Sequence, residues 1–143
     1  EDNLLPLAAL YNLNKQTEDA LQKKVWLKSG GYLVIEPTEA LTVVDVNTGK
    51  NIAKKEMQEN FLKVNIEAAE EIARQLRLRN ISGIVIVDFI NLEAKSAESE
   101  LLNVFGAALK KDPVPTQIVE MTKLGLVEVT RKKIKKSLRE SLS

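Results

Sequence analysis

The chain has 143 residues, of which 44% are hydrophobic and 29% are charged, so it can form the core of one ordinary domain and is not a disordered tail. There are 21 Lys and Arg residues against 20 Asp and Glu residues, a formal net charge of +1, so any basic surface for a nucleic acid has to be local. Cysteine and histidine are both absent (0 of each). Their absence excludes disulfides, Cys/His zinc sites, thiol nucleophiles and imidazole acid–base catalysis. Any catalysis therefore has to use carboxylates, Lys or Arg, hydroxyl groups and a bound hard metal ion.

The N-terminal 24 residues are predicted to be a lead-in that forms the end of a neighbouring domain. A short helix is expected over residues 17–23, with Thr17 as its cap. The chain begins without the basic and apolar stretches of a signal peptide, and no apolar run approaches the roughly 18 residues that cross a bilayer. We therefore expect no membrane span and a cytoplasmic location.

Three short strands are predicted next, at residues 25–28, 32–35 and 41–46. The first two flank Ser29-Gly30-Gly31, which is typical of a hairpin because glycine supplies the positive φ of a tight turn. The third strand ends at Asn47-Thr48-Gly49. Three consecutive short strands predict a meander.

A long helix is predicted over residues 53–79, because apolar residues recur there at steps of four and three. Its apolar stripe consists of Leu62, Ile66, Ala69, Ala73 and Leu76. Residues 84–87 follow as a continuous β-branched run, the pattern of a strand that is buried on both faces. A second helix is expected from Ser96 or Ala97 to residue 110, capped by Ser96.

The C-terminal part predicts two strands, at residues 116–121 and 126–130, and a basic helix over residues 131–139. The resulting order of elements predicts an α/β fold in which helices pack on a mixed β-sheet. Aromatic residues make up only 4% of the chain, so no stacking platform for single-stranded RNA is expected. The aromatic residues expected to fill the core instead are Trp26, Tyr32, Phe61, Phe89 and Phe105.

Two acids stand at the ends of apolar strands. Asp45 follows residues 41–44, Asp88 follows residues 84–87, and an asparagine comes shortly after each of them, Asn47 and Asn91. A carboxylate beside a buried strand is costly unless it is paired, hydrogen-bonded or metal-bound. Two such acids on neighbouring strands could share one Mg²⁺ ion, which polarises a phosphate and activates a water without any histidine. The alternative is that each Asp only caps the turn that follows it.

The basic segment near the C-terminus also has two interpretations. Its cations attract phosphate if they lie beside the acids, but a charge run is equally typical of a solvated helix or a connection to a further domain. The members of this segment are Arg131, Lys132, Lys133, Lys135, Lys136 and Arg139. No phosphate-binding glycine loop occurs in the chain, which excludes P-loop nucleotide hydrolysis.

At these positions the sequence closely resembles the ribonuclease E/G family of endoribonucleases. The collinear blocks that resemble it span about residues 20 to 142 and are 27–35 (LKSGGYLVI), 38–42 (TEALT), 45–49 (DVNTG), 65–69 (NIEAA), 71–80 (EIARQLRLRN), 86–90 (IVDFI) and 124–131 (LGLVEVTR). The resemblance implies that residues 25–143 form the family's DNase I-like catalytic subdomain. It also implies that residues 1–24 are the end of the ribonuclease H-like subdomain.

The resemblance further implies a function for the two acids. Asp45 and Asp88 would be catalytic and hold Mg²⁺, for which Mn²⁺ could substitute, and Asn47 would assist at the scissile phosphate. The expected activity is hydrolysis of single-stranded RNA to 5′-phosphate products, in messenger decay and in ribosomal and transfer RNA maturation. Lys123, Arg131, Lys132 and Lys133 are the residues expected to bind RNA.

The chain also departs from the family pattern. Asn91 stands where many relatives have a second acid, and the family's zinc-linking Cys-Pro-x-Cys motif, OB-fold domain and 5′-end sensor are absent. Zinc cannot be bound here by Cys or His, and the chain resembles an excised piece of a larger, homo-oligomeric enzyme. The residues by themselves also allow two other functions. One is a folded scaffold with only weak RNA affinity; the other is a metal-dependent DNA nuclease or phosphatase, although those enzymes generally use catalytic histidines.

Overall fold

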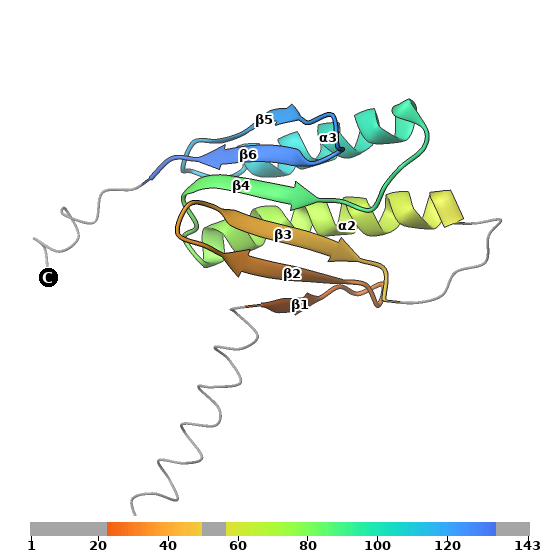
Figure 1. The fold of residues 1–143 in the computed structure, drawn as a ribbon, viewed down its shortest axis with the longest axis horizontal. Coiled ribbons are helices and arrows are strands. Elements are labelled where there is room, and N and C mark those ends of the chain that lie inside the picture. Colours follow the sequence, from red (N-terminus) through yellow and green to blue (C-terminus); the bar gives the residue numbers. More distant parts are fainter. Residues whose placement is uncertain (1–22, 50–56, 134–143) are drawn as a thin grey trace, which may run out of the picture.

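The computed structural model describes residues 23–49 and 57–133. In this part of the chain, six strands form one sheet in the order β1-β2-β3-β4-β6-β5, and two helices cover it (Figure 1). The strands are β1 (Lys24–Trp26), β2 (Tyr32–Pro37), β3 (Thr42–Asn47), β4 (Gly83–Asp88), β5 (Thr116–Met121) and β6 (Val127–Arg131). The helices are α2 (Met57–Leu78) and α3 (Lys95–Lys110).

The pairing of the strands confirms the predicted mixed sheet. Strands β3 and β4 pair in parallel, and the other neighbouring pairs among the described strands are antiparallel. A parallel pair needs a long crossover, and α2 lies within the crossover from β3 to β4. Because β3 and β4 are parallel, their carboxyl ends lie at the same end of the sheet.

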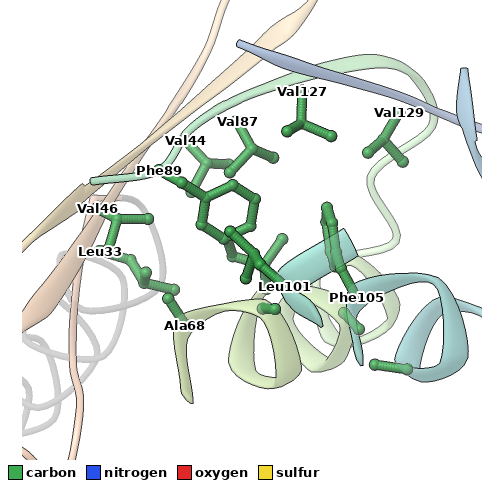
Figure 2. Close-up of a cluster of buried hydrophobic side chains, with 14 of the residues drawn as sticks. Leu33, Val44, Val46, Ala68, Val87, Phe89, Leu101, Phe105, Val127 and Val129 are labelled. Atoms are coloured by element: carbon green, nitrogen blue, oxygen red, sulfur yellow. The ribbon is translucent and has the colours of Figure 1, made fainter. Parts of the chain in front are cut away.

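Both helices lie on the same face of the sheet (Figure 1), so side chains alternate between a buried helix face and an open face. In β3, residues Thr42, Val44 and Val46 are buried, whereas Asp45 and Asn47 between and after them are partly exposed. Figure 2 shows the core between the layers, where strand side chains lie above those of α2 and α3. Within it, the rings of Phe89 and Phe105 pack edge to face, with centroids 5.4 Å apart.

The prediction that β4 is buried on both faces is wrong, because both helices cover the same face of the sheet. Val85 and Val87 are fully buried under the helices, but Ile84 is 39% exposed on the other face. A run of β-branched residues does not distinguish a strand covered on both faces from one whose apolar outer face is open.

Some predicted boundaries also change. The second helix begins at Lys95, and its N-cap is Ala94, without a side-chain capping bond, so the assignment of Ser96 as the cap is wrong. Strand β6 extends to Arg131, which places that residue in the sheet and not in a helix. The expected helices over residues 17–23 and 131–139 fall largely outside the described residues, as does the start of the long helix predicted from residue 53.

The aromatic prediction is right for Phe89 and Phe105, which are buried, and wrong for Trp26. Trp26 is 63% exposed, because it alternates with Val25 on the edge strand β1 and so lies on the open face. Among the described helices, none is long and apolar enough to cross a membrane.

Candidate active site

The structure brings Asp45 and Asp88 together. In the parallel register of β3 and β4, Asp45 is the direct partner of Asp88, one position after the partners Val44 and Val87. Val44 and Val87 point into the core, so the two carboxylates extend from neighbouring strands onto the same, open face of the sheet. A slip of either strand by one residue would turn its acid onto the helix-covered face and separate the pair.

The electrostatics agree with this proximity. Partial loss of solvent raises the pKa of Asp88, and the negative charge of Asp45 raises it further. Holding two carboxylates side by side is therefore unfavourable, and a bound cation would relieve the repulsion. The pair is therefore a candidate cation-binding site.

Asn47 lies two residues after Asp45 on the same face of β3. Its amide Nδ2 donates a hydrogen bond to Asp45 Oδ2 over 3.3 Å. This contact holds the carboxylate from one side and places the Asn47 side chain next to the pair of acids.

A hairpin loop supports the turn that follows β3. The β1–β2 loop packs so closely on residues 47–49 that a Cβ on Gly31 would lie 2.7 Å from the Asn47 carbonyl oxygen. On the other side, Gly49 has φ +72, and a Cβ there would lie 2.5 Å from the Gly30 carbonyl oxygen. Only glycine fits these positions, so the Gly30-Gly31 pair and Gly49 fix where β3 ends.

Helix α2 also contacts this hairpin loop. The Glu67 carboxylate oxygen Oε2 accepts hydrogen bonds from the backbone amides of Lys28, over 2.6 Å, and Ser29, over 3.3 Å. Charge-assisted bonds of this kind are among the stronger ones in proteins. The helix, the hairpin loop and the turn after β3 therefore form one connected support for Asp45 and Asn47.

Asn65 of α2 holds the segment that follows Asp88 in place. Its side chain is 0% exposed, its Nδ2 donates to the Ile90 carbonyl over 2.8 Å, and its Oδ1 accepts from the Ile90 amide over 2.9 Å. Sequence reasoning missed this residue. The signal was present, because Asn65 stands four residues before Ala69 on the apolar stripe of α2, where a polar side chain needs a partner.

We expect Asn65→Ala to lower the free energy of unfolding by about 2–4 kcal/mol, because it leaves a buried amide and a buried carbonyl of Ile90 unpaired. Urea unfolding measures this loss. Asn103→Ala is the matched comparison, because Asn103 is an exposed asparagine of helix α3. A loss as large in Asn103→Ala as in Asn65→Ala would show that the two-bond clamp is not what matters.

The predicted RNA-binding cations separate into two groups. Lys123 is exposed in the β5–β6 turn, and that turn borders the same cavity as Asp88, of about 140 Å³, through Leu124 and Gly125. Lys132 and Lys133 are exposed beyond the end of β6. Strand β6 runs antiparallel to β4, with Arg131 opposite Gly83, so these two lysines lie at the other end of the sheet from Asp88.

The prediction that Arg131 contacts RNA is corrected by its surroundings. Arg131 is 4% exposed, and its guanidinium pairs with Asp112 over 2.7 Å. It also donates to Asn80 Oδ1 over 3.1 Å and to the Ile81 carbonyl over 3.0 Å. The side chain thus ties β6 to the loops at the far end of the sheet and is not available to a phosphate.

The two acids suit a Mg²⁺ ion that takes only some of its ligands from the protein. Within residues 23–49 and 57–133, no three acids gather closely enough to surround a metal ion. Mg²⁺ commonly uses only one or two carboxylates and completes its shell with waters and substrate phosphates. The donor set of Asp45 and Asp88, open to solvent on one side, meets that requirement.

Comparison with known proteins identifies the family of the chain. A model described as the Ribonuclease E/G family matches residues 1–134. The chain is 48% identical over 128 residues to Ribonuclease E of a Nostoc species, a match that covers 90% of the chain and 19% of that relative. It is 44% identical over 137 residues to Ribonuclease G of Salmonella typhimurium, which covers 96% of the chain and 28% of the relative. Ribonuclease E of a Synechocystis species is 46% identical over 136 residues, covering 95% of the chain and 20% of the relative.

The matches extend over almost all of this chain but only a part of each relative, between 19% and 28% for these three. The family model matches well over half of the chain, and its match includes both acids, Asn47 and the helix that supports them. The chain belongs to the ribonuclease E/G family.

Proposed function

We propose that the chain is the catalytic subdomain of a magnesium-dependent endoribonuclease that hydrolyses single-stranded RNA. The observation that carries the proposal is the pairing of Asp45 with Asp88 on the open face of the sheet. The names of the relatives, Ribonuclease E and Ribonuclease G, support RNA as the substrate.

Each residue of the site has a distinct role in this proposal. Asp45 and Asp88 hold the cation, which when bound supplies a Lewis acid and an activated water. Asn47, held against Asp45, orients the phosphate or the attacking water. Lys123, in the turn that borders the Asp88 cavity, attracts the RNA backbone.

In-line attack of water on the phosphorus, with the 3′-oxygen leaving, gives a 5′-phosphate on the downstream product. Such a reaction suits the processing of ribosomal RNA and the decay of messenger RNA, in the cytoplasm. The chain would act there within a longer, homo-oligomeric protein.

A second candidate is a folded scaffold that binds RNA weakly and does not cleave it alone. The observation that favours it is the short share of each relative that the chain covers, at most 28% for the relatives above. It predicts salt-sensitive association with RNA and no hydrolysis.

Incubation of the chain with end-labelled single-stranded RNA and DNA oligomers, with and without Mg²⁺, separates these functions. Cleavage of RNA that needs Mg²⁺ and leaves 5′-phosphate ends supports the proposal. Binding without cleavage supports the scaffold, and preferential cleavage of DNA would reject both in favour of a DNA nuclease.

A further inference from the structure

An exposed aromatic pair lies on the open face of the sheet. Trp26 of β1 is 63% exposed and is the direct partner of Tyr32 in β2, with ring centroids 5.1 Å apart. An exposed tryptophan on an edge strand adds nothing to the core, which Val25 and Leu27 on either side of it reach instead. Most of the indole surface is therefore left open to a ligand.

A cation completes this cluster. The Nζ atom of Lys24 lies 4.3 Å from the Trp26 ring centroid and 4.2 Å from that of Tyr32. Within residues 23–49 and 57–133, no salt bridge to a carboxylate is formed by Lys24, so its charge is held by the two rings and by solvent. The two aromatic rings offer a stacking surface for a base, and the ammonium group beside them offers a positive charge for an adjoining phosphate.

The register connects this cluster to the acids. Trp26 pairs with Tyr32 and Tyr32 pairs with Asn47, so these three side chains form one row across the open face. Lys24 pairs with Val34, which pairs with Asp45, and that row ends at Asp88. With strands about 4.8 Å apart, Trp26 lies roughly 10 Å from Asn47 along its row. The cluster is therefore beside the two acids and on their face of the sheet.

We propose that Trp26 and Tyr32 form a stacking subsite for a base of the single-stranded RNA substrate, close to the bond that is cleaved, and that Lys24 binds an adjoining phosphate. The inference rests on the proposed nuclease function, because that function makes RNA the occupant. Stacking is tolerant of base identity, since every base has a π-face. The subsite thus holds the strand across the acids without selecting a sequence.

Binding can be measured without cleavage, in the absence of divalent cations and in an Asp88→Asn background. The chain has 1 tryptophan, Trp26, so its fluorescence reports directly on this site. We expect short single-stranded oligoadenylate to quench it in a saturable way. A ribose-phosphate oligomer of the same length without bases should bind more weakly and leave the fluorescence nearly unchanged.

Variants then separate stacking from charge, with fluorescein-labelled RNA and anisotropy as the readout. Trp26→Ala should weaken binding of oligoadenylate roughly tenfold, as removal of a stacking aromatic does, and should leave binding of the abasic oligomer unchanged. Trp26→Phe should restore most of the affinity, and Lys24→Gln should weaken both oligomers. Leu78→Ala is the matched control, because Leu78 is also an exposed apolar residue but lies at the far end of α2. If Trp26→Ala loses its folded circular dichroism spectrum, Tyr32→Leu takes its place.

Equal weakening of the abasic oligomer and oligoadenylate by Trp26→Ala would overturn the subsite, as would RNA binding that leaves the tryptophan fluorescence unchanged. Failure of the nuclease proposal gives a different result. A chain that never cleaves RNA but shows base-dependent quenching keeps the subsite, whereas cleavage without a Trp26 effect removes the subsite and keeps the nuclease.

Discussion

Asp45→Asn and Asp88→Asn should each abolish Mg²⁺-dependent RNA cleavage while leaving RNA binding nearly intact. The loss in rate should be at least the roughly hundred- to thousandfold that removal of one charge-stabilising group costs in hydrolases. The physical reason is that each change removes one of two charges that hold the cation, while the amide keeps the size and shape of the side chain. Cleavage of labelled RNA gives the rate, and Mn²⁺ titration by calorimetry gives metal binding independently of activity.

The stability of these two variants separates a site from a structural turn. Because the charge of Asp45 raises the pKa of Asp88, replacing either acid removes a repulsion, so the free energy of unfolding without metal should stay equal or rise. Glu36→Gln is the matched control, because Glu36 is an exposed acid of β2, opposite Val43 near the other end of the sheet. Wild-type turnover and Mn²⁺ affinity in either Asp variant would remove the assignment.

Asp112→Ala should lower the free energy of unfolding by about 3–5 kcal/mol, because it leaves the buried guanidinium of Arg131 without its carboxylate. This is a large part of the roughly 5–15 kcal/mol that a domain has in total. Urea unfolding at neutral pH is the measurement. Arg74→Ala is the control, because the Arg74 side chain is 56% exposed and its pair with Glu71, over 3.5 Å, should contribute less than about 1 kcal/mol.

The same pair makes stability depend on pH. Burial alone would raise the pKa of Asp112, but hydrogen bonds from Arg131, Val114 and Thr116 and the charge of Arg131 lower it below the ordinary 3.8. A carboxyl with a lowered folded-state pKa contributes stability that is present above its unfolded pKa and lost as pH falls through the folded value. The difference in unfolding free energy between the wild type and Asp112→Ala should therefore be constant above about pH 5 and shrink below pH 4. A difference that stays constant in acid would contradict the role of the ion pair.

Local patterns predicted most of the elements. Strand β5 has the predicted bounds, and the other strands shift by one or two residues, because alternation and turn residues act over short stretches of chain. The same local patterns predicted Asp45 and Asp88 as candidate site residues, because each is a carboxylate at the end of an apolar strand. The absence of histidine and cysteine already restricted the chemistry to carboxylates, Lys or Arg, hydroxyl groups and a bound hard cation.

Strand order and the placement of the helices decided the rest. That Asp45 is the partner of Asp88 follows from the parallel pairing of β3 with β4, which no local pattern contains. Arg131 looked like a free cation in a basic run, but the antiparallel pairing of β6 with β4 buries it beside Asp112. Trp26 looked like a core residue, but both helices cover the other face of the sheet. Side-chain periodicity fixes which residues share a face, whereas long-range packing chooses which face is covered and which strands are neighbours.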